Sequence, residues 1–140
     1  MYSSPTLDIQ YRPDLDLLTV RWLDALRPDL FQQDYHTILS ESRNHNTTRW
    51  LVDVRRRPHP TPEMADWAAN VWLPEVVAAL APVRPRLAYL ISPSREEALK
   101  ASPALQQSMQ AAISPARGYD VAIFNDEGLA TEWLLAEQSA

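Results

Sequence analysis

Cysteine is absent from this sequence of 140 residues, and glycine occurs only twice. The lack of cysteine excludes disulfide bonds, thiolate metal sites and a cysteine nucleophile. A glycine-rich loop that cradles a phosphate needs several glycines close together, so two glycines also exclude that motif. Binding chemistry in this chain must therefore come from other side chains.

Long apolar runs and an excess of positive charge are also missing. No stretch approaches the ~18 apolar residues of a membrane span, and residues 1–8 contain neither the basic nor the apolar region of a signal peptide. We therefore expect a cytoplasmic protein with no integral membrane segment. The formal net charge is −5, which disfavours nucleic acid as a partner.

Apolar residues make up 46% of the chain, which is typical of a globular protein. No linker, repeat or low-complexity tract interrupts the sequence, so we expect one domain over residues 1–140. Alternating apolar residues at 7–11 and 18–22 predict an antiparallel hairpin. Nearly continuous apolar runs at 49–55 and 87–91 predict strands covered on both faces, and residues 119–124 predict a further apolar strand.

Helical patterns lie between these strands and after the last one. The first has Asp29 as its expected N-cap and an apolar stripe of Phe31, Tyr35, Ile38, Leu39 and Ser42. The predicted order is β-β-α-β-α-β-α-β-α, in the α/β class. Such an order implies a five-stranded, mostly parallel sheet with an antiparallel edge strand and helices packed on it.

The later helices carry recognisable start signals. Thr61-Pro62-Glu63 begins the second helix, which we expect to kink or break at Pro74. Ser94 and Glu97 form a capping box for the third, and a further helix should start at Ser102-Pro103. Asn125 or Asp126 should cap the last helix. Its predicted buried face consists of Leu129, Ala130, Trp133 and Leu134.

Several of these segments resemble the small bacterial STAS-like proteins, which are similar to anti-sigma-factor antagonists and to the SEC14 shape. The resemblance lies in the hairpin, in residues 50–55 and 86–90, and in a closing pattern. That pattern consists of Phe124, Asp126, Ala130, Trp133 and Leu134. The resemblance implies a non-enzymatic binding or regulatory domain that contacts a partner protein or a second copy of itself, as a homodimer.

In the antagonist branch of that family, a kinase phosphorylates a serine after the central strand. The family's Asp-Ser pair is missing here, and Thr61 supplies the one hydroxyl of residues 57–62. The resemblance thus makes Thr61 the counterpart of the phosphorylated serine. The alternative is that Thr61 only caps its helix.

The loop that contains Thr61 is the first candidate binding site. It carries Arg55, Arg56, Arg57 and His59 at the carboxyl end of an inner strand, before a helix N-terminus. Ligands of open α/β sheets bind at that edge, and arginine favours anions. The prediction is an anion or acidic-partner site, and the alternative is a solvated turn whose arginines pair with Glu63 or Asp66.

Asp53 lies within an apolar strand, and a buried carboxylate needs a partner. We expect an arginine or the amides of the next loop to supply it. The alternative is an enzyme that uses Asp53, His59 and the arginines on an anionic substrate. The three histidines are scattered and no nucleophile elbow is present, so the sequence predicts no metal site, no cofactor and no catalytic set.

The second candidate site is apolar. Trp67, Val71, Trp72 and Val76 follow one another on the helix that Pro74 interrupts, and tryptophan is favoured at interfaces. A cavity or patch under the break would hold a small apolar or lipid-like ligand, or a second copy of the chain. Core packing is the alternative for each of these residues.

Overall fold

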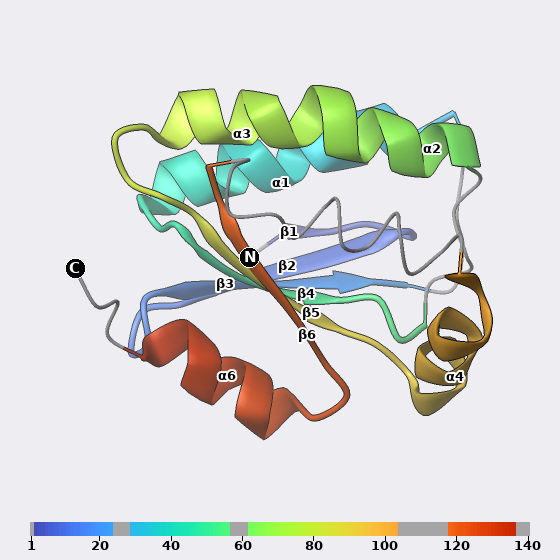
Figure 1. The fold of residues 1–140 in the computed structure, drawn as a ribbon. Coiled ribbons are helices and arrows are strands. Elements are labelled where there is room, and N and C mark those ends of the chain that lie inside the picture. Colours follow the sequence, from blue (N-terminus) through green and yellow to red (C-terminus); the bar gives the residue numbers. More distant parts are fainter. Residues whose placement is uncertain (1, 24–28, 57–61, 104–117, 137–140) are drawn as a thin grey trace.

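The computed structural model describes residues 2–23, 29–56, 62–103 and 118–136. Six strands form one sheet in sequential order (Figure 1). The strands are β1 (Tyr2–Ser3), β2 (Leu7–Arg12), β3 (Leu17–Trp22), β4 (Arg49–Asp53), β5 (Arg86–Leu90) and β6 (Asp120–Phe124). Strand β2 is antiparallel to both of its neighbours, whereas β3 to β6 are parallel.

The predicted mixed α/β sheet is confirmed, but the predicted count of five strands is wrong. Tyr2 and Ser3 pair with Ile9 and Asp8, which adds a sixth strand at the edge. The antiparallel strand β2 is therefore inside the sheet. Two residues are too few to show an alternating pattern, which is why the sequence gives no signal for β1.

Helices cover both faces of the sheet. They are α1 (Phe31–His45), α2 (Pro62–Trp67), α3 (Leu73–Leu80), α4 (Pro93–Ala101) and α6 (Glu127–Leu135), with one turn of π-helix, η1 (Ala68–Trp72), between α2 and α3. Figure 1 shows α1, α2 and α3 on one face and α6 on the other. None of the helices in the described ranges is long and apolar enough to cross a membrane.

The larger core lies between the sheet and α1 to α3. All five residues of the predicted stripe on α1 are buried, which confirms that prediction. Tryptophan side chains cross this core and find polar partners. The indole of Trp72 donates to the main-chain oxygen of Tyr35 at 3.0 Å, and that of Trp50 donates to Ser42 Oγ at 2.8 Å. These bonds satisfy the indole N–H groups of two fully buried rings.

The smaller core lies under α6. Leu51, Leu90, Ala130 and Leu134 are buried there, and Phe124 and Trp133 pack against them. Leu129 was expected on this face, but its side chain is 54% exposed. The buried residues Ala130 and Leu134 are four apart, and Leu129 lies about 100° to the side of Ala130 on the helix.

Helix starts are predicted less accurately than helix faces. Asp126 caps α6, since its Oδ1 accepts from the Leu129 amide at 3.0 Å. Leu30, not Asp29, occupies the cap position of α1, and the Leu30 side chain makes no capping hydrogen bond. Helix α4 begins at Pro93, and Ser92 Oγ accepts from the Arg95 amide, so the cap is two residues before Ser94. Proline fits the first turn of a helix, so α4 begins earlier in the sequence than the predicted cap, Ser94.

The helix does not stop at Pro74. The Leu73 amide donates to the oxygen of Ala68, five residues earlier, and Pro74 lies in the first turn of α3. A π-turn shifts the hydrogen-bond pattern, so that the missing N–H of proline causes no break. The helix predicted to follow Ser102-Pro103 falls within residues 104–117, outside the described residues.

Candidate functional site

The carboxyl ends of the parallel strands bring polar side chains together at one edge of the sheet. Arg21 near the end of β3 pairs in register with Asp53 at the end of β4. Both side chains are on the α6 face, because Leu51, two residues before Asp53, packs in the core under α6. The helix α6 starts at this same edge, and Glu127 is its first residue.

Asp53 is the centre of this cluster. Arg55 donates to it three times, from its amide and Nε to Oδ1 at 3.0 Å each and from Nη2 to Oδ2 at 2.9 Å. Arg21 donates from Nη1 to Oδ2 at 2.7 Å. Four donors on one carboxylate confirm that an arginine and a loop amide are the partners of Asp53.

The electrostatics of Asp53 favour its ionised form. Burial alone would raise the pKa of Asp53, but the hydrogen bonds and charges of Arg55 and Arg21 outweigh it, so the pKa lies below the ordinary value. An ionised carboxylate with four donors is a weak base. Asp53 therefore acts as a support that holds two guanidinium groups, and its environment does not favour proton abstraction.

The two arginines remain partly open to solvent. The side chain of Arg21 is 38% exposed and that of Arg55 is 42% exposed, whereas that of Asp53 is only 9% exposed. Arg21 also donates from Nη2 to Glu127 Oε1 at 2.8 Å, and the Glu127 side chain is 45% exposed. We call these four residues, Arg21, Asp53, Arg55 and Glu127, the carboxyl-edge cluster.

The structure places only part of the predicted arginine loop. Arg55 belongs to the carboxyl-edge cluster, and Arg56 is exposed next to it. Arg57, His59 and Thr61 lie outside the described residues. Asp66, an expected partner of these arginines, accepts a hydrogen bond from Asn70 at 2.7 Å.

The predicted apolar residues do not share one surface. Trp72 is 1% exposed and Val76 is fully buried, whereas Val71 is 52% exposed. Successive helical residues point about 100° apart, so Val71 and Trp72 face opposite environments. Trp72 and Val76 pack in the larger core, where the sequence also allowed a ligand cavity.

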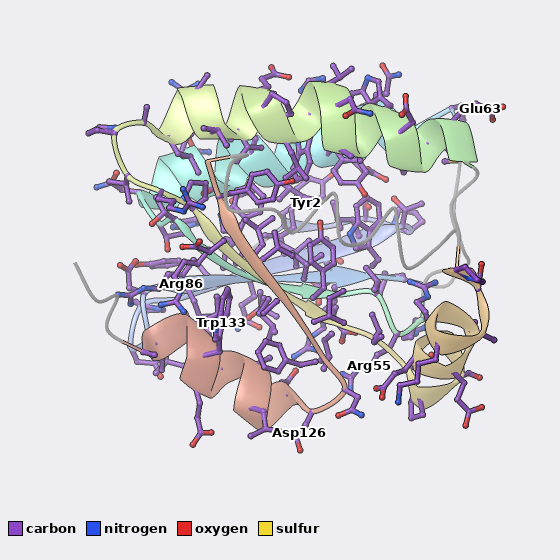
Figure 2. All side chains as sticks on the ribbon, in the orientation of Figure 1. Tyr2, Arg55, Glu63, Arg86, Asp126 and Trp133 are labelled. Carbon is purple, nitrogen blue, oxygen red and sulfur yellow. The ribbon has the colours of Figure 1, made fainter. Side chains whose placement is uncertain are left out.

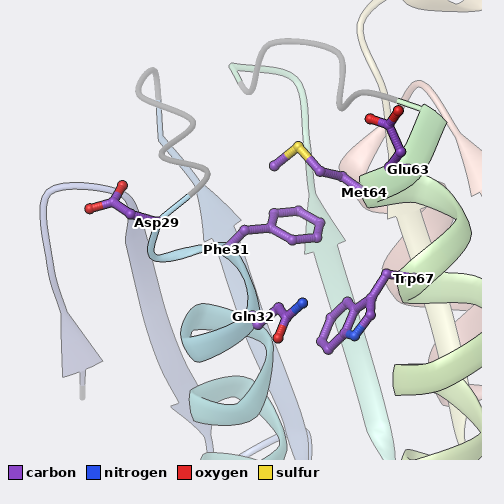
Figure 3. Close-up of a pocket in the computed structure, with 6 residues that line it drawn as sticks. All are labelled: Asp29, Phe31, Gln32, Glu63, Met64 and Trp67. Carbon is purple, nitrogen blue, oxygen red and sulfur yellow. The ribbon is translucent and has the colours of Figure 1, made fainter.

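Trp67 lines a surface hollow of about 360 Å³ between the start of α1 and α2. Its lining is Asp29, Phe31, Gln32, Glu63, Met64 and Trp67. Figure 3 shows Phe31, Met64 and Trp67 extending toward one another, and the rings of Phe31 and Trp67 lie 5.9 Å apart. The hollow thus has an apolar floor with acidic groups at its margin.

Two members of the carboxyl-edge cluster were missed in the sequence. Arg21 occupies a polar position of an alternating strand, and Glu127 follows a helix cap, so neither position is unusual locally. The two residues are 106 positions apart. Only the strand register brings them together, and no local pattern contains that information.

Among the described residues, no group of three or more histidine, aspartate or glutamate side chains is placed to hold a metal ion. No protein-family model matches the chain, and no curated protein matches it. The function proposed below is therefore argued from the geometry of the site and from the residues that carry the STAS-like resemblance.

Proposed function

We propose that this chain is a non-enzymatic binding or regulatory domain of the STAS-like kind, which recognises an acidic segment of a partner protein at the carboxyl-edge cluster. One observation carries the proposal. Two guanidinium groups are fixed on a single buried carboxylate, and about two fifths of each arginine side chain still faces solvent.

Fixed arginines are suited to this task. A guanidinium has five N–H donors, and Asp53 takes one side-chain donor of Arg21 and two of Arg55. Arg21 uses a further donor, Nη2, for its bond to Glu127. Because the buried carboxylate already holds the side chains in place, binding loses less rotamer entropy than it would with free arginines.

The contact of Glu127 with Arg21 supports the proposal. It reaches Arg21 from another element at 2.8 Å while nearly half of its side chain is exposed. An exposed ion pair contributes little to stability, so an incoming carboxylate can replace Glu127 at small cost. We infer that Glu127 occupies the partner's position in the free protein.

A display selection tests the proposal. Random peptides would be selected on the immobilised protein, and we expect the selected sequences to be enriched in aspartate and glutamate. Arg55→Gln should weaken the binding of a selected peptide about tenfold, the effect of losing one charge-assisted hydrogen bond. The matched control is Arg12→Gln, which removes the same charge from an exposed pair with Asp14. Equal affinities for the two variants would refute the proposal.

The hollow at Trp67 supports a second candidate, a carrier of a small apolar ligand. Its volume of about 360 Å³ is near the lower end of the range for small-molecule sites. Native mass spectrometry of freshly purified protein should then show an added mass that Trp67→Ala removes. A spectrum with the bare protein mass alone would count against this candidate.

A further inference from the structure

The opposite, amino edge of the sheet contains a basic hollow that the proposed function does not use. It has a volume of about 430 Å³. Its lining is Thr48, Arg49, Val83, Arg84, Arg86, Leu135 and Ala136. Three of these residues are arginines and none is acidic, although the whole chain carries a charge of −5. Figure 2 shows Arg86 and Trp133 away from Arg55 and Asp126, toward the other end of α6.

Arg86 is the central residue of this hollow. It is only 9% exposed, and its guanidinium carbon lies 4.2 Å from the centre of the Trp133 ring. Nη1 donates to the main-chain oxygen of Ala136 at 2.8 Å. Nε is buried and has no hydrogen-bond partner among the described residues. A buried, charged donor without an acceptor is costly, so the Arg86 guanidinium would be stabilised by an anion that enters the hollow.

The neighbouring strands increase this imbalance of charge. Arg49 and Arg86 are the first residues of β4 and β5 and pair in register, so both side chains are on the α6 face. Like charges side by side on adjacent strands repel each other. Asp120 is in register with Arg86 on the other side, but it forms its ion pair with Arg84 at 2.9 Å. Within the described ranges, the Arg49 side chain makes a long contact from Nη1 to the oxygen of Leu15 at 3.5 Å.

We propose that this hollow binds a phosphate dianion, held by Arg49 and Arg86 with Arg84 at its margin. Guanidinium groups match the tetrahedral oxygens of phosphate, and a dianion offsets the repulsion between the paired arginines. Val83 and Leu135 are 53% and 36% exposed at the margin of the hollow. They provide an apolar contact for the organic part of a phosphomonoester.

The test is a titration of the full chain with inorganic phosphate and, separately, with phenyl phosphate. NMR of the arginine Nε–H signals monitors both titrations. The Nε–H signal of Arg86 should shift with saturation below roughly 10 mM phosphate, and chloride at equal ionic strength should leave it in place. Tighter binding of phenyl phosphate that Val83→Ser removes would identify a phosphomonoester as the ligand. Equal binding of the two would identify free phosphate.

Variants at the two ends of β4 provide the control. Arg49→Gln should weaken phosphate binding at least about tenfold. Arg55→Gln removes the same charge beyond the other end of the strand and should leave phosphate binding unchanged. If Arg49→Gln does not fold, Arg84→Gln replaces it. An unshifted Arg86 signal, or equal weakening by Arg49→Gln and Arg55→Gln, would overturn the proposal. The acidic-partner proposal is independent of this result, because its own assay depends on Arg55.

Discussion

Replacing Asp53 with asparagine removes the charge that holds the carboxyl-edge cluster together, while the size of the side chain is kept. Four hydrogen bonds from Arg21 and Arg55 end on this carboxylate, and its side chain is 9% exposed. Removing one partner of a fully buried ion pair costs about 3–5 kcal/mol. Water reaches both arginines here, and their solvation reduces that cost. We expect Asp53→Asn to lower the free energy of unfolding by about 2 kcal/mol.

Urea denaturation at pH 7 measures this change, with an unchanged slope as the sign that the unfolded state is not altered. The control is Asp14→Asn, which disrupts the solvent-exposed pair with Arg12 and should have no resolvable effect. If Asp53→Asn changed the midpoint no more than Asp14→Asn, the description of Asp53 as a buried support would be wrong.

The pH dependence provides a second check on Asp53. Its pKa is lower in the folded protein than in the unfolded chain, so the unfolded chain binds more protons between the two values. The stability from this residue is fully present above the ordinary pKa of about 4 and is lost as the pH falls through the lower, folded-state pKa. The difference in stability between the wild type and Asp53→Asn should therefore narrow below about pH 4.

Three further substitutions have expected effects that urea denaturation can measure. Burial raises the pKa of Asp34, so its ionised form lowers the stability of the folded protein at neutral pH. Asp34→Asn should therefore raise the free energy of unfolding by about 1 kcal/mol at pH 7. This gain should vanish below about pH 4, where the carboxyl group is protonated in both states. Trp72→Leu should lower the free energy of unfolding by about 3 kcal/mol, because it leaves a cavity and removes the hydrogen-bond donor to the main-chain oxygen of Tyr35. Gly118 has φ +89°, and an added Cβ would lie 3.1 Å from Val77 Cγ1; Gly118→Ala should cost about 1–2 kcal/mol.

Exposed residues supply the controls for two of these predictions. Val71→Ala changes the residue next to Trp72, but Val71 is 52% exposed and its replacement should be nearly neutral. Asp14→Asn removes an exposed carboxylate whose pKa the hydrogen bond from Arg12 lowers, so it should not share the pH-dependent gain of Asp34→Asn. A similar loss for Val71→Ala and Trp72→Leu would contradict the placement of Trp72 in the core. A gain for Asp34→Asn that is constant from pH 3 to 7 would contradict the raised pKa of Asp34.

Local periodicity was sufficient to predict much of the fold. The stripe on α1 is buried as its spacing indicates, and the apolar runs of β4 and β5 form inner, parallel strands. Such patterns depend on residues within one or two turns of each other. The buried carboxylate of Asp53 was also predictable, because a charge inside an apolar strand needs a partner wherever that partner comes from.

Features that depend on register were not predictable. Strand β1 has only two residues, and the contact between Arg21 and Glu127 joins positions 106 apart. The pairing of Arg49 with Arg86 is equally invisible in the sequence, since each is simply a polar residue before an apolar run. The pattern of a single element predicts which face is buried, but it does not reveal which residue of another strand lies alongside.

The most direct test of the acidic-partner proposal is the effect of Glu127→Gln on the binding of a selected acidic peptide. If Glu127 occupies the partner's position on Arg21, removing its charge should tighten binding several-fold in fluorescence anisotropy. The control, Glu132→Gln, removes the same charge from an exposed position on the same helix. Tighter binding by Glu127→Gln alone is the result we predict. Unchanged binding, or an equal gain for both variants, would contradict it.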